Sequence, residues 1–486
     1  MLAKENLLLT LEHKHRGVEQ LVARRAHNPK VAGSSPVPTT SKSRLRKWAA
    51  FCFAQNSFRS EVLMTMNHFS FKRLFHFGNK GLSLFLASFV VVAVLSFAAP
   101  PVLAEPLLCG IDRLEASGFR ELSGLRAGLI TNAASLGQKG DPGYLLMLRN
   151  GVKLKFLMAP EHGFSADIEE GKQVGSMFFA GTLPVYSLYG ISKKPDIRQL
   201  RQIDVLVFDL QDIGTRCYTY ISTMKNAMEA CDEAGIAFMV LDRPNPVAPL
   251  LQEGFMLTPG YESFVGAVNI PFVHAMTAGE IALLLKEQLY KKLDLRVIPM
   301  EGYRRNRFAD EYPDFSFKSP SPNIRTVDAA IVYPATVFLE ATTVSEGRGT
   351  DAPFMQFGAP FIKSEEIAVA LKKYQLSGVS FDTIVFQPRS GKFSGERCQG
   401  IKIFLTDRNV FSPFRTATAI LLELQHFYPD KIALDKGGKL FDNLAGTPRF
   451  REMIKKQLPL EVIMEESRQQ VEQFNRKNPS RPILYH

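Results

Sequence analysis

The hydrophobic pattern of residues 105–327 predicts parallel strands that alternate with helices. Helical spacing of apolar residues over Thr219–Glu233, ended by Gly235, predicts one helix. A capping box at Thr277 and Glu280 predicts the start of another. Short and nearly continuous apolar runs suit strands that are covered on both faces, and they occur at Arg126–Thr131, Val152–Met158, Asp204–Leu210, Ile236–Leu241 and Leu295–Met300. This order predicts an α/β domain with a Rossmann-like parallel sheet.

From Asp328 onward the alternation becomes less regular. Strand-like and helical segments are mixed there, at Ile384–Gln387, Gly400–Thr406, Ser364–Tyr374, Ser412–Phe427 and Pro459–Phe474. We therefore expect a smaller α+β domain over 328–486, packed on a first domain over 105–327. The loop Lys318–Arg325 holds two prolines and Asn323, and it is either a rigid hinge or a loop that closes over a crevice.

An apolar run near residue 90 predicts an export signal. Leu82–Ala99 is a stretch of eighteen residues without a charge, with Lys72, Arg73 and Lys80 before it and Val102-x-Ala104 after it. These are the parts of a secretory signal peptide, here over 64–104 with cleavage after Ala104. The alternative is a transmembrane anchor, because eighteen apolar residues approach the length that spans a bilayer.

The signal implies a shorter mature chain than the printed one. Met64 or Met66 precedes the basic residues as a true initiator would, and 1–63 is then a spurious or disordered extension. After cleavage we expect a periplasmic or extracellular protein with no stable membrane insertion.

Charge is unevenly distributed between this leader and the rest of the chain. The 486 residues hold 59 basic and 48 acidic side chains, a net charge of +11, which by itself suggests an acidic partner such as nucleic acid. Residues 1–104 contain 14 of the basic and 4 of the acidic side chains, so 45 and 44 remain in 105–486. The globular part is therefore near neutral, and we expect no nucleic-acid partner.

Several common cofactor and catalytic motifs are missing. The glycines after the first predicted strand, Gly137, Gly140 and Gly143, do not form G-x-G-x-x-G, and neither a phosphate-binding loop nor a G-x-S-x-G elbow occurs. No cysteine pair has CxxC spacing, and no His/Asp/Glu set has the spacing of metal ligands. We predict neither a cofactor nor a metal.

Polar side chains follow four of the predicted strands, where an open parallel sheet binds its ligands. A single such residue is as often a helix cap or a turn former. The whole set predicts an enzyme crevice, and it consists of Asn132 after the first strand, Glu161 and His162 after the second, Asp209, Asp212, Arg216 and Tyr218 after the third, and Asp242, Arg243 and Asn245 after the fourth.

Glycoside hydrolysis by carboxylates is the simplest chemistry for this set. It needs one carboxylic acid to protonate the leaving oxygen and a second carboxylate as nucleophile or base. Glu161, between a proline and His162-Gly163, is the expected acid. Asp209, Asp212 and Asp242 all remain open for the second role. Strands ~4.8 Å apart allow either a retaining or an inverting separation.

Two further features lie outside the strand ends. Glu346 and Arg348 are joined through glycines in Ser345–Thr350, which is either a loop that approaches a ligand closely or a turn with a surface ion pair. His274 follows an apolar run and precedes a helix, so it is either a core or capping residue or a ligand contact.

Nearly the whole of 110–486 resembles one bacterial family, the NamZ-type exo-β-N-acetylmuramidases of peptidoglycan recycling. The similar stretches include GLITNAASL, APEHGFSADIEEGKQVG, DVLVFDLQDIGTRCYTYISTMKNAMEA, VLDRPNPV, PSPNIRT and VYPATVFLEATTVSEGRGTDAPF. Together they are specific, although each alone is a weak signal.

The resemblance implies a Rossmann-like catalytic domain, a smaller C-terminal domain over its cleft, and release of terminal N-acetylmuramic acid from muropeptides or disaccharides. It implies that Glu161 of the Pro-Glu-His-Gly motif is catalytic, although this chain has Ala159 where the family commonly has serine. The lactyl carboxylate of the sugar would bind Arg216, Arg243 or, preferably, Arg348. The alternative function is an envelope protein that binds such sugars without cleaving them.

Overall fold

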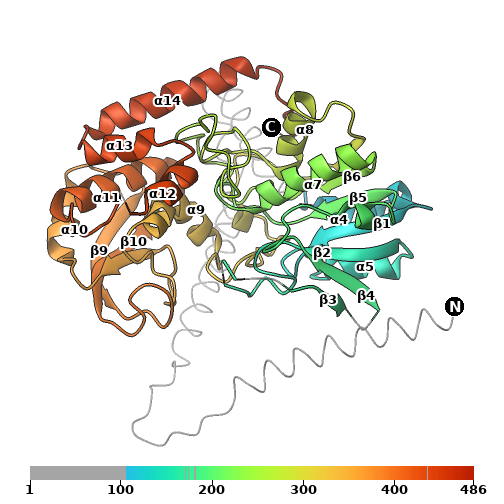
Figure 1. Ribbon diagram of the computed structural model, residues 1–486, viewed down its shortest axis with the longest axis horizontal. Coiled ribbons are helices and arrows are strands. Elements are labelled where there is room, and N and C mark those ends of the chain that lie inside the picture. The colour runs from blue at the N-terminus through green and yellow to red at the C-terminus, as the bar shows by residue number, and fades with distance from the viewer. Residues whose placement is uncertain (1–104, 170, 173–174, 180–181, 435, 486) are drawn as a thin grey trace, which may run out of the picture. The chain divides into compact units, whose positions relative to one another are not determined.

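The computed structural model describes residues 105–485 except 170, 173–174, 180–181 and 435 (Figure 1). The extension expected over 1–63 and the signal peptide expected over 64–104 lie outside the described residues. In the part that is described, no helix is both long and apolar enough to cross a membrane.

A seven-stranded sheet forms the first half of the described chain. Its strand order is β3-β4-β2-β1-β5-β6-β7, and every neighbouring pair is parallel except that of the edge strand β3. Without β3, this is the strand order of the doubly wound dinucleotide-binding sheet. The strands are β1 (Arg126–Thr131), β2 (Lys153–Ala159), β3 (Met177–Phe179), β4 (Leu183–Ser187), β5 (Val205–Asp209), β6 (Ala237–Leu241) and β7 (Leu295–Ile298). The prediction of a parallel α/β sheet is confirmed.

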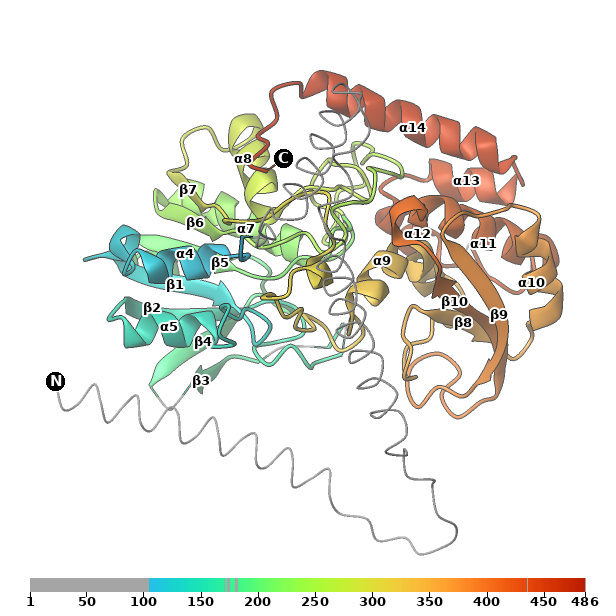
Figure 2. The ribbon, with the colours of Figure 1, turned by 180° about the vertical axis from the view of Figure 1, so that it is seen from behind.

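Helices cover both faces of this sheet (Figures 1 and 2). Successive side chains of a strand point to opposite faces, so Val205 and Val207 of β5 join one apolar cluster, and Leu206 and Phe208 join another. The first cluster includes α4 (Gly110–Ala116) and α5 (Gly143–Arg149), and the second includes α7 (Tyr220–Ala234) and α8 (Ala278–Gln288). The short α6 (Ile197–Leu200) lies beside α7. The predicted capping box of α8 is present.

The second half combines a small antiparallel sheet with helices, as the α+β prediction requires. The sheet has the order β8-β10-β9, with β8 (Gln356–Ala359), β9 (Val379–Phe386) and β10 (Cys398–Leu405). The helices are α9 (Val327–Thr336), α10 (Ser364–Lys372), α11 (Pro413–Phe427), α12 (Gly438–Ala445), α13 (Arg449–Lys455) and α14 (Leu460–Lys477). Single 3₁₀ turns occur at Arg120–Leu122, Ala309–Glu311, Val337–Ala341 and Arg408–Val410.

The two halves share one apolar core. The cluster that holds Phe208 and Met228 of the first half continues through Phe338 to Leu421 and Phe450 of the second. The boundary expected at 327/328 lies at the start of α9, inside this packing. Residues 105–486 accordingly form one compact unit.

Candidate active site

The carboxyl ends of three neighbouring strands bring the main candidates to one edge of the sheet. Thr131 at the end of β1 pairs with Asp209 at the end of β5, and Ile130 pairs with Met158 of β2. The loops that begin with Asn132, Pro160 and Leu210 therefore start side by side. This is also the point where the strand order reverses, which is the usual ligand site of such sheets.

Glu161 is held by groups from two other segments. Its Oε2 accepts a 2.7 Å hydrogen bond from the hydroxyl of Thr219 at the start of α7, and its Oε1 accepts a 3.3 Å bond from the Gly171 N–H. The residue is only 7% exposed. A carboxyl group in this position is fixed in orientation and shielded from bulk water, which suits a general acid.

His162, the next residue, has a left-handed backbone with φ of 70°. This conformation is costly for a residue with a side chain and is found mainly where the surroundings enforce it. The ring Nδ1 lies 2.8 Å from the Ile168 carbonyl, and because a carbonyl only accepts, Nδ1 donates. The ring also stacks on Tyr218 at a centroid distance of 6.5 Å. His162 therefore links the Glu161 loop to the entrance of α7.

Tyr220 joins three loops of the site. Its hydroxyl accepts a 2.8 Å hydrogen bond from Asn132 and lies 2.6 Å from the Pro320 carbonyl and 3.3 Å from the Glu161 carbonyl. Burial raises its pKa, so the hydroxyl keeps its proton and donates. The loop Lys318–Arg325 is thus packed on the strand-end loops, with Asn323 9% exposed.

Two buried polar groups near this point have no hydrogen-bond partner among the described residues, namely Oδ1 of Asp212 and the hydroxyl of Tyr218. The Asp212 carboxylate is one of the charges that, with burial, raise the pKa of Tyr218 well above its ordinary value. Groups of this kind usually face water or a ligand.

The other oxygen of Asp212 is fixed. Oδ2 accepts a 2.7 Å bond from the Gly214 N–H and lies 3.3 Å from Nε2 of the fully buried His274. Nδ1 of His274 accepts from the Met276 N–H at 3.2 Å, so Nε2 carries the ring proton, and it lies near Asp212 without forming a hydrogen bond among the described residues. Of the two readings left open for His274, the packed core residue is correct, and its neighbour is a site carboxylate.

Asp209 and Arg243 form a buried ion pair at the strand ends. Nε of Arg243 donates to Oδ1 of Asp209 at 2.6 Å, Nη1 donates to the Leu136 carbonyl at 2.9 Å, and both side chains are at most 3% exposed. Oδ2 of Asp209 and Nη2 of Arg243 have no hydrogen-bond partner among the described residues, and Arg243 lines a small pocket with Leu136 and Gln211. The catalytic role of Asp209 and the substrate-binding role of Arg243 stay predictions.

Asp242 and Asn245 also have structural surroundings. Oδ2 of Asp242 accepts from Thr277 and from Tyr485, each at 2.7 Å, and Oδ1 accepts from the Gly279 N–H at 2.9 Å. Burial raises the pKa of Asp242 to about 6. Asn245 bonds the Met276 carbonyl and the Val247 N–H, both at 3.0 Å. Both residues connect β6 to the start of α8 and are corrected from substrate contacts.

Arg216 is the clearest correction. It is 1% exposed, and its guanidinium donates to the carbonyls of Phe255 at 2.7 Å, Ile270 at 2.9 Å and Ala445 at 2.5 Å. Burial lowers its pKa to about 10. Ala445 is the last residue of α12, so Arg216 satisfies the end of a helix from the other half of the chain.

Arg348 and Glu346 belong to a charged cluster in the second half, defined by Glu340, Glu346, Arg348 and Lys392. Arg348 donates to Glu340 at 2.8 Å and lies 3.6 Å from Glu346, which accepts from Lys392 at 3.0 Å. The cluster reaches the strand-end loops through a chain of edge-to-face rings, because Arg348 lies over Phe354, Phe354 packs on Tyr333, and Tyr333 packs on Tyr218. With 16% side-chain exposure, Arg348 is the most accessible of the three arginines considered.

Sequence reasoning missed three residues that the structure places in these networks. Thr219 and Tyr220 bond Glu161 directly, and their position at a helix start after a strand-end loop was a usable signal. Lys392 has no signal in the sequence, because it lies 46 residues from its partner Glu346. Across the described ranges, no three His, Cys, Asp or Glu side chains gather as a metal site.

Comparison with known proteins identifies the family. The family model "Exo-beta-N-acetylmuramidase NamZ, N-terminal" matches residues 127–328, and its C-terminal counterpart matches 331–485. The peptidoglycan β-N-acetylmuramidase NamZ of Bacillus subtilis (strain 168) is 42% identical over 378 residues, 77% of this chain and 91% of the relative.

Solved structures agree with this relationship. A crystal structure of a DUF1343 family protein from Bacteroides fragilis has a TM-score of 0.72 at 34% identity, covering 78% of this chain and 99% of the other. A second DUF1343 protein of that organism has a TM-score of 0.62 at 25% identity, covering 79% and 99%. The chain therefore belongs to the NamZ exo-β-N-acetylmuramidase family.

Proposed function

We propose that the protein is an exo-acting glycosidase that removes terminal N-acetylmuramic acid from peptidoglycan fragments, with Glu161 as general acid. The single observation that carries the role of Glu161 is its anchoring by Thr219 at the strand-order reversal of the sheet, in a chain of this family. The anchored carboxyl group protonates the glycosidic oxygen as the bond to the anomeric carbon breaks.

Asp212 is the second carboxylate in this proposal. Both oxygens of Asp242 accept bonds from Thr277, Gly279 or Tyr485, and Oδ1 of Asp209 is paired with Arg243. Oδ2 of Asp209 has no partner among the described residues, but Asp209 is fully buried whereas Asp212 is 6% exposed, which favours Asp212. Asp212 keeps Oδ1 without a partner among the described residues while Gly214 holds Oδ2. An oriented carboxylate with one open oxygen suits a base for water or a stabiliser of the positive charge that develops on the sugar.

The test compares hydrolysis of a disaccharide with terminal N-acetylmuramic acid with release of 4-nitrophenol from 4-nitrophenyl β-N-acetylmuramide. The natural leaving group is a sugar alkoxide, which needs a proton, so Glu161→Gln should lower kcat on the disaccharide by about 10²–10⁴-fold. The 4-nitrophenolate group leaves without a proton, so the loss on the chromogenic muramide should be much smaller. Asp212→Asn should lower kcat on the disaccharide by a factor similar to that of Glu161→Gln. The matched control is Glu287→Gln, an exposed residue of α8, which should keep wild-type kinetics.

The outcomes separate the proposal from its alternative. Full activity of a folded Glu161→Gln variant on the disaccharide refutes the general-acid role. Calorimetric binding of muropeptides by the wild type without any new reducing end identifies a sugar-binding protein.

Export is the second part of the proposal. The uncharged run Leu82–Ala99 follows Lys72, Arg73 and Lys80 and precedes the expected cleavage site at Ala104, and a peptidoglycan substrate is an envelope polymer. N-terminal sequencing of the protein from its native cells should begin at Glu105. An intact mass that corresponds to residues 1–486 contradicts this.

A further inference from the structure

A large pocket lies apart from the Glu161 site. It has a volume of about 830 Å³, and its walls come from both halves of the chain. They consist of the loop Ala248–Gln252, the start of α8, the loop with Arg305 and Asn306, one face of α14, and the tail Arg481–Ile483. This volume is within the range of small-molecule sites. None of the residues assigned to catalysis above lines the pocket.

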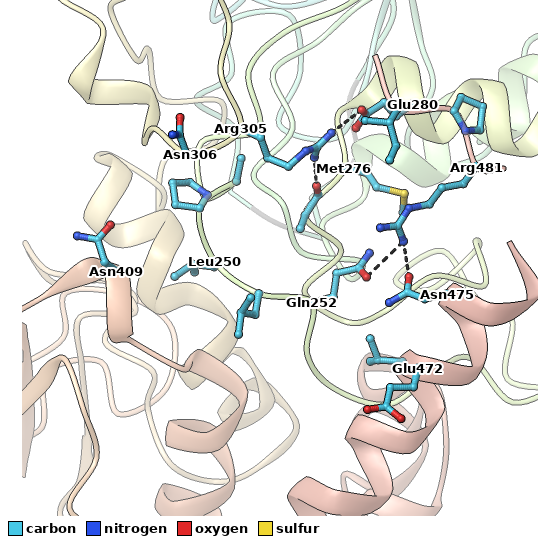
Figure 3. A pocket seen from close by; sticks show the side chains of 17 residues that line it. Leu250, Gln252, Met276, Glu280, Arg305, Asn306, Asn409, Glu472, Asn475 and Arg481 are labelled. Atoms are coloured by element: carbon cyan, nitrogen blue, oxygen red, sulfur yellow. Dashed lines mark hydrogen bonds and ion pairs between the residues drawn. The ribbon is translucent and has the colours of Figure 1, made fainter. Parts of the chain in front are cut away.

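Two guanidinium groups enter this pocket (Figure 3). Arg305 has a charge partner, because it donates to Glu280 at 2.5 Å and to the Ala275 carbonyl. Glu280 is 1% exposed and also accepts from the N–H of Thr277 and of Leu484 at 3.0 Å each. The Glu280 carboxylate is therefore already paired with Arg305 and hydrogen-bonded to two backbone N–H groups.

Arg481 has no carboxylate within ion-pair distance among the described residues. Its guanidinium donates to two neutral amide oxygens, Oδ1 of Asn475 and Oε1 of Gln252, the latter at 3.3 Å (Figure 3). Burial and the positive charge of Arg305 both lower its pKa, so the surroundings oppose the charge of Arg481. A guanidinium group normally remains charged. A bound carboxylate would supply the missing negative charge through a bidentate ion pair with Arg481.

The other residues that line the pocket indicate which chemical groups a carboxylate bound to Arg481 would carry. Leu250, Met276, Val471 and Pro482 form an apolar wall, and Leu251 and Ile483 stand at 78% and 50% exposure. Side-chain amides, from Gln252, Asn306, Asn409 and Asn475, are interspersed with them. Amides pair with peptide groups, and the apolar wall suits small aliphatic side chains.

From these contacts we propose that the pocket binds the free carboxyl end of a short peptide, with the terminal carboxylate on Arg481. Two kinds of molecule present such a carboxyl end. One is a peptide linked to muramic acid in a cell-wall fragment, and the other is a free peptide. The site is independent of the proposed catalytic role of Glu161.

The test compares acid and amide on the full-length protein by calorimetry. N-acetyl-alanyl-alanine should bind at least about tenfold more tightly than its C-terminal amide, because the amide cannot form the charged pair. Arg481→Gln should remove this preference, and Arg481→Lys should retain only part of it because lysine lacks the planar fork. The matched control is Arg476→Gln near the end of α14, whose side chain is 71% exposed and 3.9 Å from Glu472.

The wild-type comparison keeps the test valid even if an Arg481 variant misfolds. Equal binding of acid and amide, or no binding of either at millimolar concentration, overturns the proposal, as does a folded Arg481→Gln variant that keeps the preference.

N-acetylmuramyl-alanyl-alanine separates the two sources. If its binding also depends on Arg481, a sugar-linked peptide is a source; if only the unlinked peptide depends on Arg481, the source is free peptide. Repeating the titrations with Glu161→Gln protein should leave the peptide affinities unchanged, so failure of the catalytic proposal does not affect this result.

Discussion

The hydroxyl of Thr219 donates a 2.7 Å hydrogen bond to Oε2 of Glu161, which joins the first residue before α7 to the loop after β2. The two residues are 58 positions apart in the sequence. Thr219 is 7% exposed, as is Glu161, so water competes little for this bond. Thr219 therefore positions the carboxyl group that we propose as the proton donor.

Thr219→Val should impair turnover more than binding. Valine is similar in shape but has no hydroxyl, so the Glu161 carboxyl group loses its anchor and samples unproductive orientations. We expect kcat for a disaccharide with terminal N-acetylmuramic acid to fall about tenfold or more, with little change in KM. Thr219→Ser keeps the donor and should retain most of kcat. Equal activity of the valine and serine variants would show that the bond has no catalytic role.

Arg348→Met should weaken binding of the sugar carboxylate. Of the three arginines considered, only Arg348 combines exposure with a link to the strand-end loops, through Phe354 and Tyr333. We expect KM for the muramide to rise about tenfold or more, since a charge-assisted bond is lost. The control is Arg389→Met, an exposed arginine paired with Asp351.

Esterification of the substrate offers a second measurement for Arg348. Wild-type protein should discriminate against the methyl ester of the lactyl group, and Arg348→Met should not. Persistent discrimination by the variant would assign the carboxylate to another group.

Arg216→Met should affect stability rather than substrate recognition. The substitution leaves the buried carbonyls of Phe255, Ile270 and Ala445 without their donor, and each unsatisfied buried carbonyl costs about 1–3 kcal/mol. Urea unfolding should show a loss of at least about 2 kcal/mol, while KM of the folded fraction at low temperature stays at its wild-type value. A raised KM without loss of stability would restore Arg216 as a substrate residue.

Asp242 should make stability depend on pH in a narrow window. Its pKa is raised to about 6 in the folded protein, so the folded state binds this proton more tightly than the unfolded chain. Its contribution to stability is then full below about pH 4 and is lost as the pH rises through about 6. Two pKa units correspond to about 3 kcal/mol at most.

Asp242→Asn provides the measurement. Asparagine stays neutral, so the unfolding free energy of the wild type minus that of the variant should decrease between pH 4 and pH 7, while the other titrating groups cancel. A difference that is constant over this range contradicts the raised pKa.

The sequence predicted secondary structure correctly where apolar residues dominated a whole segment. Continuous apolar runs located β1, β2, β5 and β6 to within one residue. Strand β4, which lies between β2 and the edge strand β3, contains Pro184, and α9 contains Pro334. Proline disfavours both a strand and a helix interior, so the local sequence did not predict these two elements.

Individual roles at the strand ends could not be deduced in the same way. The pattern identified where Asp209, Asp212 and Asp242 lie along the chain, but not what each one meets. Arg243 is 34 residues from its partner Asp209, and Tyr485 is 243 residues from its partner Asp242. Only the folded arrangement shows which carboxylate oxygens are paired with such long-range partners.

Tyr485, the last residue described, has a consequence for the order in which the chain matures. Its hydroxyl bonds Asp242 at the end of β6, and its neighbour Leu484 bonds Glu280 of α8. These contacts cannot form while the final residues are still in the ribosome. Asp242 and Glu280 therefore gain these partners only after Tyr485 and Leu484, 243 and 204 residues further along the chain from them, have left the ribosome.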